Sequence, residues 1–108
     1  MRYLMTTKAT DHAPDDTLYV EMGKFIAEMT EKGILLATGG LEPAGVVIRS
    51  EGDEITVTDG PFAEAKEAVA GFALVEVRSR EEAIELGRRF RRIVGDGESV
   101  IQQVFSAS

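Results

Sequence analysis

Apolar and polar positions divide the chain into short strand-like runs and two longer stretches with helical spacing. Apolar or alternating runs, the pattern of β-strands, occupy residues 2–7, 34–38, 46–49, 55–58, 72–77 and 100–105. The apolar residues with helical spacing are Leu18, Met22, Phe25, Ile26 and Met29, and then Ala83, Leu86, Phe90 and Ile93. The pattern predicts six strands and two amphipathic helices.

The helix ends carry their own signals. The first helix is expected over residues 16–32, after a polar loop that holds the only histidine, His12, and Gly33 is expected to end it. Ser79 and Glu82 stand at the spacing of a capping box, so the second helix should begin there, and Gly95 can stop it.

The order of the elements predicts the fold class. Residues 51–54 form a polar tip between two strands, which predicts a hairpin, and Gly39-Gly40 is expected to end the strand before it. The resulting order, β-α-β-hairpin-β-α-β, is that of an α+β, ferredoxin-like split β-α-β fold with an inserted hairpin. We expect one domain over residues 1–108.

The predicted sheet has more apolar surface than its two helices can cover. Phe72 and Leu74 alternate with apolar neighbours. In the last strand Ile101 and Phe105 alternate with Val100 and Val104, so both faces of these strands are apolar. A large uncovered apolar face is rare on monomers, and the common solution is an isologous homodimer. We expect two sheets to pack face to face.

Composition narrows the classes of partner and location. Nineteen Asp and Glu against twelve Lys and Arg give a net charge of -7, which opposes binding to nucleic acid and to anionic membranes. The chain has no cysteine, no apolar run of membrane-spanning length and no leader pattern. These features favour a soluble cytoplasmic protein, with no disulfide and no thiolate metal site.

The most distinctive stretch is residues 58–67. Gly60 and Pro61 force a sharp change of direction, which fixes the places of Asp59 before them and Phe62 after them. Asp59 could act as an acid or base, or it could be a turn residue whose carboxylate accepts backbone N–H groups. Glu64, Lys66 and Glu67 could line a polar pocket, but such a charged group is more typical of a solvated face.

Asp59-Gly60-Pro61-Phe62 resembles the DGPF signature of the YCII-related proteins, and the order of elements over residues 1–105 is similar to theirs. The resemblance implies a dimeric α+β barrel, and a function that is largely unassigned in the family. In one branch, a histidine on the first helix and an aspartate in a cleft resemble a catalytic pair. Many DGPF relatives are encoded beside sigma factors, which implies a functional link to one.

The chain departs from the enzyme-like branch. Met22 stands near the place of the helix histidine, and a thioether cannot transfer protons. His12 lies in the loop before the helix, where a lone histidine is more often an ordinary surface residue than an acid or base. A candidate ligand site is expected where strand ends and a helix face converge. Its predicted residues are Met22, Gly39, Gly40, Asp59 and Phe62.

Other chemistry has less support. The arginines at positions 88, 89, 91 and 92 complement the C-terminal end of a helix, and no spacing of ligands predicts a metal site or a nucleotide cofactor. The sequence favours a ligand-binding or regulatory accessory protein for a small polar metabolite. The alternative is a small, cofactor-independent enzyme, lyase-like or isomerase-like, that uses Asp59 as acid or base.

Overall fold

A computed structural model describes residues 1–8, 15–60 and 69–106 of the chain. The elements in order are β1 (Arg2–Lys8), α1 (Asp16–Glu31), β2 (Leu35–Gly40), β3 (Val46–Glu51), β4 (Glu54–Asp59), β5 (Val69–Glu76), α2 (Arg80–Val94) and β6 (Ser99–Val104). Every strand and helix predicted from the sequence pattern is present. Residues 9–14, which include His12, and residues 61–68, which include Phe62, lie outside the described ranges.

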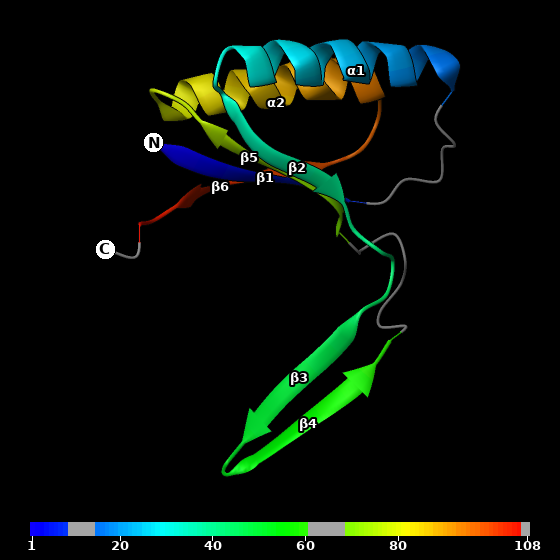
Figure 1. Cartoon of the computed structure of the whole chain (residues 1–108), viewed down its shortest axis with the longest axis vertical. Helices are drawn as coiled ribbons and strands as arrows, with labels where there is room; N and C mark the ends of the chain where they lie inside the picture. Colours follow the sequence, from blue (N-terminus) through cyan, green and yellow to red (C-terminus); the bar gives the residue numbers. More distant parts are fainter. Residues whose placement is uncertain (9–14, 61–68, 107–108) are drawn as a thin grey trace.

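The sheet order confirms the predicted fold class. Four strands form one sheet in the order β2-β5-β1-β6, and every neighbouring pair is antiparallel. Strands β3 and β4 form a separate two-stranded sheet between β2 and β5 in the chain. This is the ferredoxin-like arrangement with an inserted hairpin. Figure 1 shows α1 and α2 side by side on one face of the larger sheet.

The core lies between that sheet face and the helices. Its buried residues are Tyr3, Met5, Met29, Val75, Val77, Ala83 and Leu86, with Phe25, Ile34, Leu35, Ala73 and Ile101 packed against them. Alternate residues of β1 and β5 contribute to it, as the two-residue period of a strand requires. The two helices contribute the apolar stripes that the sequence predicts.

Both helices begin at side-chain caps. The Asp15 carboxylate accepts a hydrogen bond from the backbone N–H of Leu18 at 2.8 Å, and the Ser79 hydroxyl accepts one from Glu82 at 3.1 Å. The Glu82 side chain in turn accepts the backbone N–H of Arg78 at 3.1 Å, one residue before the position that the capping box predicts. At the C-terminal end of α1, Gly33 has a φ of 74°. The Asp15 and Ser79 side chains satisfy backbone donors that the first turns of the helices leave unpaired.

One strand boundary differs from the expectation. Gly39 lies inside β2 and Gly40 is its last residue, and they pair with Phe72 and Gly71 of β5, so the strand runs two residues further than the apolar run ending at Thr38 predicts. The ladder continues as Leu41 donates its N–H to the Ala70 carbonyl at 2.8 Å. Backbone pairing with β5 therefore keeps both glycines in the strand, although glycine often marks a bend. Strand β5 also begins at Val69, before the apolar run from Phe72 that predicts it.

The sheet face opposite the helices carries apolar side chains. Cross-strand pairs place Leu4 beside Leu74 and Gln102, and Thr6 beside Phe72 and Val100. At one end of this face, Arg2 lies beside Val104 and forms an ion pair with Glu76 at 3.4 Å. These residues alternate with the buried ones, so they point away from the helices. No element of the described chain covers this face (Figure 1), and Val100 and Val104 are exposed.

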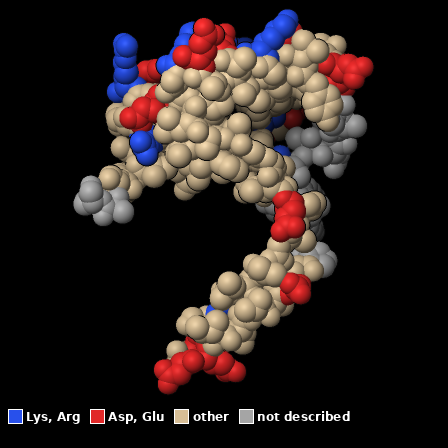
Figure 2. Space-filling model, viewed as in Figure 1, with Lys and Arg blue, Asp and Glu red and all other residues tan. Residues whose placement is uncertain are grey.

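The β3–β4 hairpin projects away from the sheet, on the side opposite the helices (Figure 1). We call residues 46–59 the arm. At its root, Gly60 donates its N–H to the Gly45 carbonyl at 2.7 Å, and at its tip Gly52 has a φ of 61°. The extensive contacts of β3 and β4 are with each other. Figure 2 shows the hollow that the arm and the sheet enclose.

In the described ranges, neither helix is long and apolar enough to cross a bilayer.

Leu86→Ala should lower the free energy of unfolding by about 2 to 5 kcal/mol, because Leu86 is buried between α2 and the sheet and its loss leaves a cavity. Chemical denaturation at neutral pH measures this change. Val20→Ala is the control, since Val20 is exposed on α1 and its truncation should change stability by less than about 0.5 kcal/mol. Equal losses in the two variants would contradict the packing described above.

Candidate functional site

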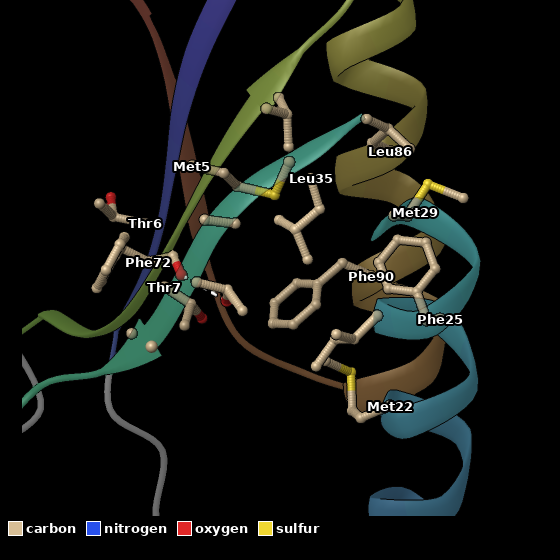
Figure 3. Close-up of a pocket in the computed structure, with 16 residues that line it drawn as sticks. Met5, Thr6, Thr7, Met22, Phe25, Met29, Leu35, Phe72, Leu86 and Phe90 are labelled. Atoms are coloured by element: carbon tan, nitrogen blue, oxygen red, sulfur yellow. Dashed lines mark hydrogen bonds between the residues drawn. The ribbon is translucent and has the colours of Figure 1, made fainter. Parts of the chain in front are cut away.

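The helices and the sheet leave an apolar cavity between them. The apolar stripe of α1 presents Met22, Phe25, Ile26 and Met29 to the sheet, at the i, i+3, i+4 and i+7 positions of one helix face. From α2, Leu86 and Phe90 lie four residues apart and point to the same space. Figure 3 shows the rings of Phe25 and Phe90 with Leu35 in the region between the helices and the strands.

The floor of the cavity is made by the sheet. Its residues there include Met5 of β1, Leu35 of β2, and Gly71, Ala73 and Val75 of β5. Gly71 and Ala73 are small, so the strand leaves room beneath the two phenylalanine rings. The cavity has a volume of about 200 Å³. An apolar cavity of about 150 Å³ is large enough to bind benzene, so this one can hold a single small ring.

The polar groups of the lining are already hydrogen-bonded. Thr38 donates its hydroxyl to the Phe72 carbonyl at 2.8 Å, and the Thr7 hydroxyl accepts a hydrogen bond from Arg91 at 3.1 Å. The side chains of Thr6 and Phe72 lie on the opposite side of the strands from the helices (Figure 3). The lining therefore offers few polar groups to orient a ligand.

Within the described ranges, the lining contains no Asp, Glu, His, Lys or Arg side chain. General acid–base catalysis needs such a group within hydrogen-bond reach of the reacting atom. Nor do these ranges contain a group of three or more His, Cys, Asp or Glu side chains placed to hold a metal ion. The described part of the cavity can enclose an apolar molecule, but it supplies no proton-transfer group.

Charged groups outside the cavity fix the two helices to each other. Arg89 of α2 donates to both carboxylate oxygens of Glu28 on α1, at 3.0 and 3.4 Å. Its guanidinium also lies over the ring of Phe25, 4.9 Å from the centroid. The hydrogen bond from Arg89, followed by that from Lys32, holds the pKa of Glu28 below its usual value. Phe25 is thus held over the cavity by an ion pair at the helix surface.

The structure places the residues of the sequence-predicted site in three ways. Met22 and Gly39 line the cavity. Gly40 follows Gly39 in β2 but does not line it. Asp59 is exposed at the end of β4, in the arm, and is also not part of the lining. Phe62 lies outside the described residues, with Glu64, Lys66, Glu67 and His12.

Sequence reasoning assigned most of the lining to the core alone. Phe25, Met29, Leu86 and Phe90 belong to ordinary helical stripes, and nothing in their spacing distinguishes a cavity wall from a filled core. The available signal was the small residues opposite them. Gly71 and Ala73 alternate on one face of β5, where larger side chains would have filled the space under the helices.

The chain belongs to the YCII-related family, because the family pattern described as "YCII-related domain" matches residues 1–104. A relative in Rhizobium meliloti (strain 1021), described as an uncharacterized protein, is 32% identical over 84 residues. The match covers 76% of this chain and 68% of that relative. The resemblance inferred from Asp59-Gly60-Pro61-Phe62 and the order of elements is therefore confirmed at the level of the family.

A solved structure shares the fold. It is 5-chloro-2-hydroxyhydroquinone dehydrochlorinase (TftG) from Burkholderia phenoliruptrix AC1100, in complex with 2,5-dihydroxybenzoquinone. The match covers 97% of this chain and 94% of that chain, with a TM-score of 0.52 and 14% sequence identity. At this identity the similarity supports the ferredoxin-like fold and carries no information about activity.

Glu28→Gln should lower the thermal midpoint slightly at pH 7 and make no difference well below pH 4. The folded-state pKa of Glu28 lies below the ordinary value of 4.5, so its contribution is present above that value and is lost as pH falls through the folded pKa. The effect is small because both partners are partly exposed. Thermal denaturation between pH 3 and pH 7 measures it.

The control for this experiment is Glu31→Gln. Glu31 lies on the same helix and makes no ion pair within the described ranges. An equal response of the two variants at pH 7 would argue against a specific contribution from the contact between Glu28 and Arg89.

Proposed function

We propose that this YCII-related protein binds a small, mainly apolar molecule in the cavity between its helices and its sheet, as a binding or regulatory accessory protein without turnover. The observation that carries the proposal is the lining: sulfur, aliphatic and aromatic groups surround a space of about 200 Å³. Met5, Met22 and Met29 add flexible, polarisable side chains, which adapt to ligands of different shape.

The lining favours an apolar ligand over the small polar metabolite that the sequence favours. A polar metabolite would lose its hydrogen bonds to water on entering this space, at a cost of roughly 1 to 3 kcal/mol for each unpaired polar group. The hydroxyls of Thr7 and Thr38 are the nearest compensation, and both already have protein partners. An apolar ring or short aliphatic molecule avoids this cost.

The enzyme alternative depends on Asp59. Its exposed position in the arm, outside the cavity lining, gives it no described contact with a molecule bound there. The fold similarity to a dehydrochlorinase is an analogy of fold only. The described geometry therefore supports binding better than proton transfer by Asp59.

The proposal has three further parts, which are the oligomeric state, the cellular location and a functional link to another protein. The apolar, uncovered face of the large sheet supports a homodimer with two sheets face to face. The net charge of -7 and the absence of cysteine support a cytoplasmic protein that binds neither nucleic acid nor membranes. A functional link to a sigma factor rests on the family resemblance of the DGPF stretch.

Benzene is a suitable probe of the cavity because it tests size and polarity together. Wild-type protein should bind it, and should bind 2,5-dihydroxybenzoquinone more weakly because that molecule has four polar substituents to desolvate. Ala73→Leu should lower benzene affinity at least tenfold, since the larger side chain fills the space above β5. Isothermal titration calorimetry measures all three affinities.

Ala27→Leu is the matched control, because Ala27 is on the exposed face of α1 and its substitution should leave the affinity unchanged. Asp59→Asn should also bind benzene as the wild type does. Failure of the wild type to bind benzene, or equal binding by Ala73→Leu, would refute the apolar site. A loss on Asp59→Asn would show that the site includes Asp59.

A further inference from the structure

The arm has one apolar face that is open to solvent. Its strand register pairs Ile48 with Val57, and Val46 and Ile55 lie two residues away on the same face. The exposed fractions of these four side chains are 56% for Val46, 67% for Ile48, 68% for Ile55 and 65% for Val57. Ser50 and Asp59 lie at the two ends of the same face, where they pair with Ile55 and Val46. The opposite face carries the half-buried Val47 with Arg49, Glu51, Glu54, Thr56 and Thr58. Four of the five large apolar side chains of the arm therefore lie on one face.

An arm of this kind is not stable by itself in water. A two-stranded hairpin is marginal unless a further strand or a helix covers its apolar face. Here the arm points away from the helices, and its strands make their extensive contacts with each other. Four large β-branched side chains on one strand face favour aggregation when water covers them. We therefore expect another surface to pack against this face of the arm.

The shape of the chain indicates what covers the arm. The arm and the uncovered sheet face bound the same hollow. Figure 2 shows charged residues over the helices, acidic residues near the root of the arm and at its tip, and uncharged surface along most of the hollow. Two copies that each carry a net charge of -7 repel one another at long range, so contact between them requires surfaces of this kind.

The areas of the uncovered sheet face and of the arm also favour a second copy of the chain as the partner. Four strands about 4.8 Å apart and about 20 Å long form a plane of roughly 400 Å², and the arm adds roughly 200 Å². Each partner in an interface of standard size buries about 800 Å². The sheet face alone supplies about half of that, and the arm brings the total closer to what a stable dimer needs.

We propose that the apolar face of the arm packs against a second copy of this chain, so that two copies clasp each other in an isologous dimer. Val46, Ile48, Ile55 and Val57 would then form a second part of the interface, continuous with the sheet face. The proposal rests on the face-to-face homodimer proposed above and is independent of the ligand in the cavity.

The double variant Ile48→Thr, Val57→Thr tests the clasp. Threonine keeps the β-branched shape that suits a strand but adds a hydroxyl, so the hairpin is preserved while its apolar face is weakened. Sedimentation over a dilution series should show the dimer dissociation constant raised at least tenfold. The matched control is Arg49→Thr with Thr58→Ser on the opposite face, which should change it less than twofold.

A second measurement covers the case in which the double variant loses the hairpin. The chain has no cysteine, so Ile48→Cys and Arg49→Cys each introduce a single thiol, one on each face of the arm. Well above the dissociation constant, the thiol of Ile48→Cys should be alkylated at least tenfold more slowly than that of Arg49→Cys. Well below it, the two rates should converge.

Three results would overturn the proposal. They are a monomer at all concentrations, equal alkylation rates of the two thiols in the dimer, and protection of the Ile48→Cys thiol that persists when the dimer is diluted apart. The last would mean that the chain's own residues cover the arm.

Discussion

Burial of one sheet face by α1 and α2 is the interaction on which the rest of the structure depends. The sheet alone has two apolar faces, and each helix alone has an exposed apolar stripe. Packing them together buries Met29, Val75 and Leu86 and fixes the helices above the strands. The opposite sheet face and the arm are the surfaces that this packing leaves uncovered.

The same packing is incomplete in one place, and that incompleteness creates the candidate site. Gly71 and Ala73 are too small to meet the rings of Phe25 and Phe90, so a cavity of about 200 Å³ lies between them. Well-packed cores have few spaces larger than a water molecule. Arg89 of α2 contacts both Glu28 and Phe25 of α1, and Phe25 lines this cavity, so the contact links the two helices beside it.

The sequence predicted the fold well because period and order are local signals. The alternation of β5, the helical stripes and the Ser79 cap each appear in a few consecutive residues. Of the residues predicted for a ligand site, Met22 and Gly39 line the cavity. Pairing with β5 continues β2 through Gly40, and the arm carries Asp59 outside the described lining. Whether a space in the core stays empty depends on the combined volume of side chains from distant elements, such as Ala73 of β5 and Phe90 of α2. A local sequence pattern carries no information about that combined volume.

The most direct test of the central claim uses the methionines. The chain has four, of which Met5, Met22 and Met29 line the cavity, while Met1 is exposed and serves as an internal control. Protein labelled with ¹³C at the methionine methyl groups can be titrated with benzene and followed by NMR. A ligand-binding cavity lined by these three methionines predicts that their methyl signals shift together, with one dissociation constant, and that the Met1 signal stays in place. Unchanged lining signals at saturating benzene, or equal shifts of all four, would contradict it.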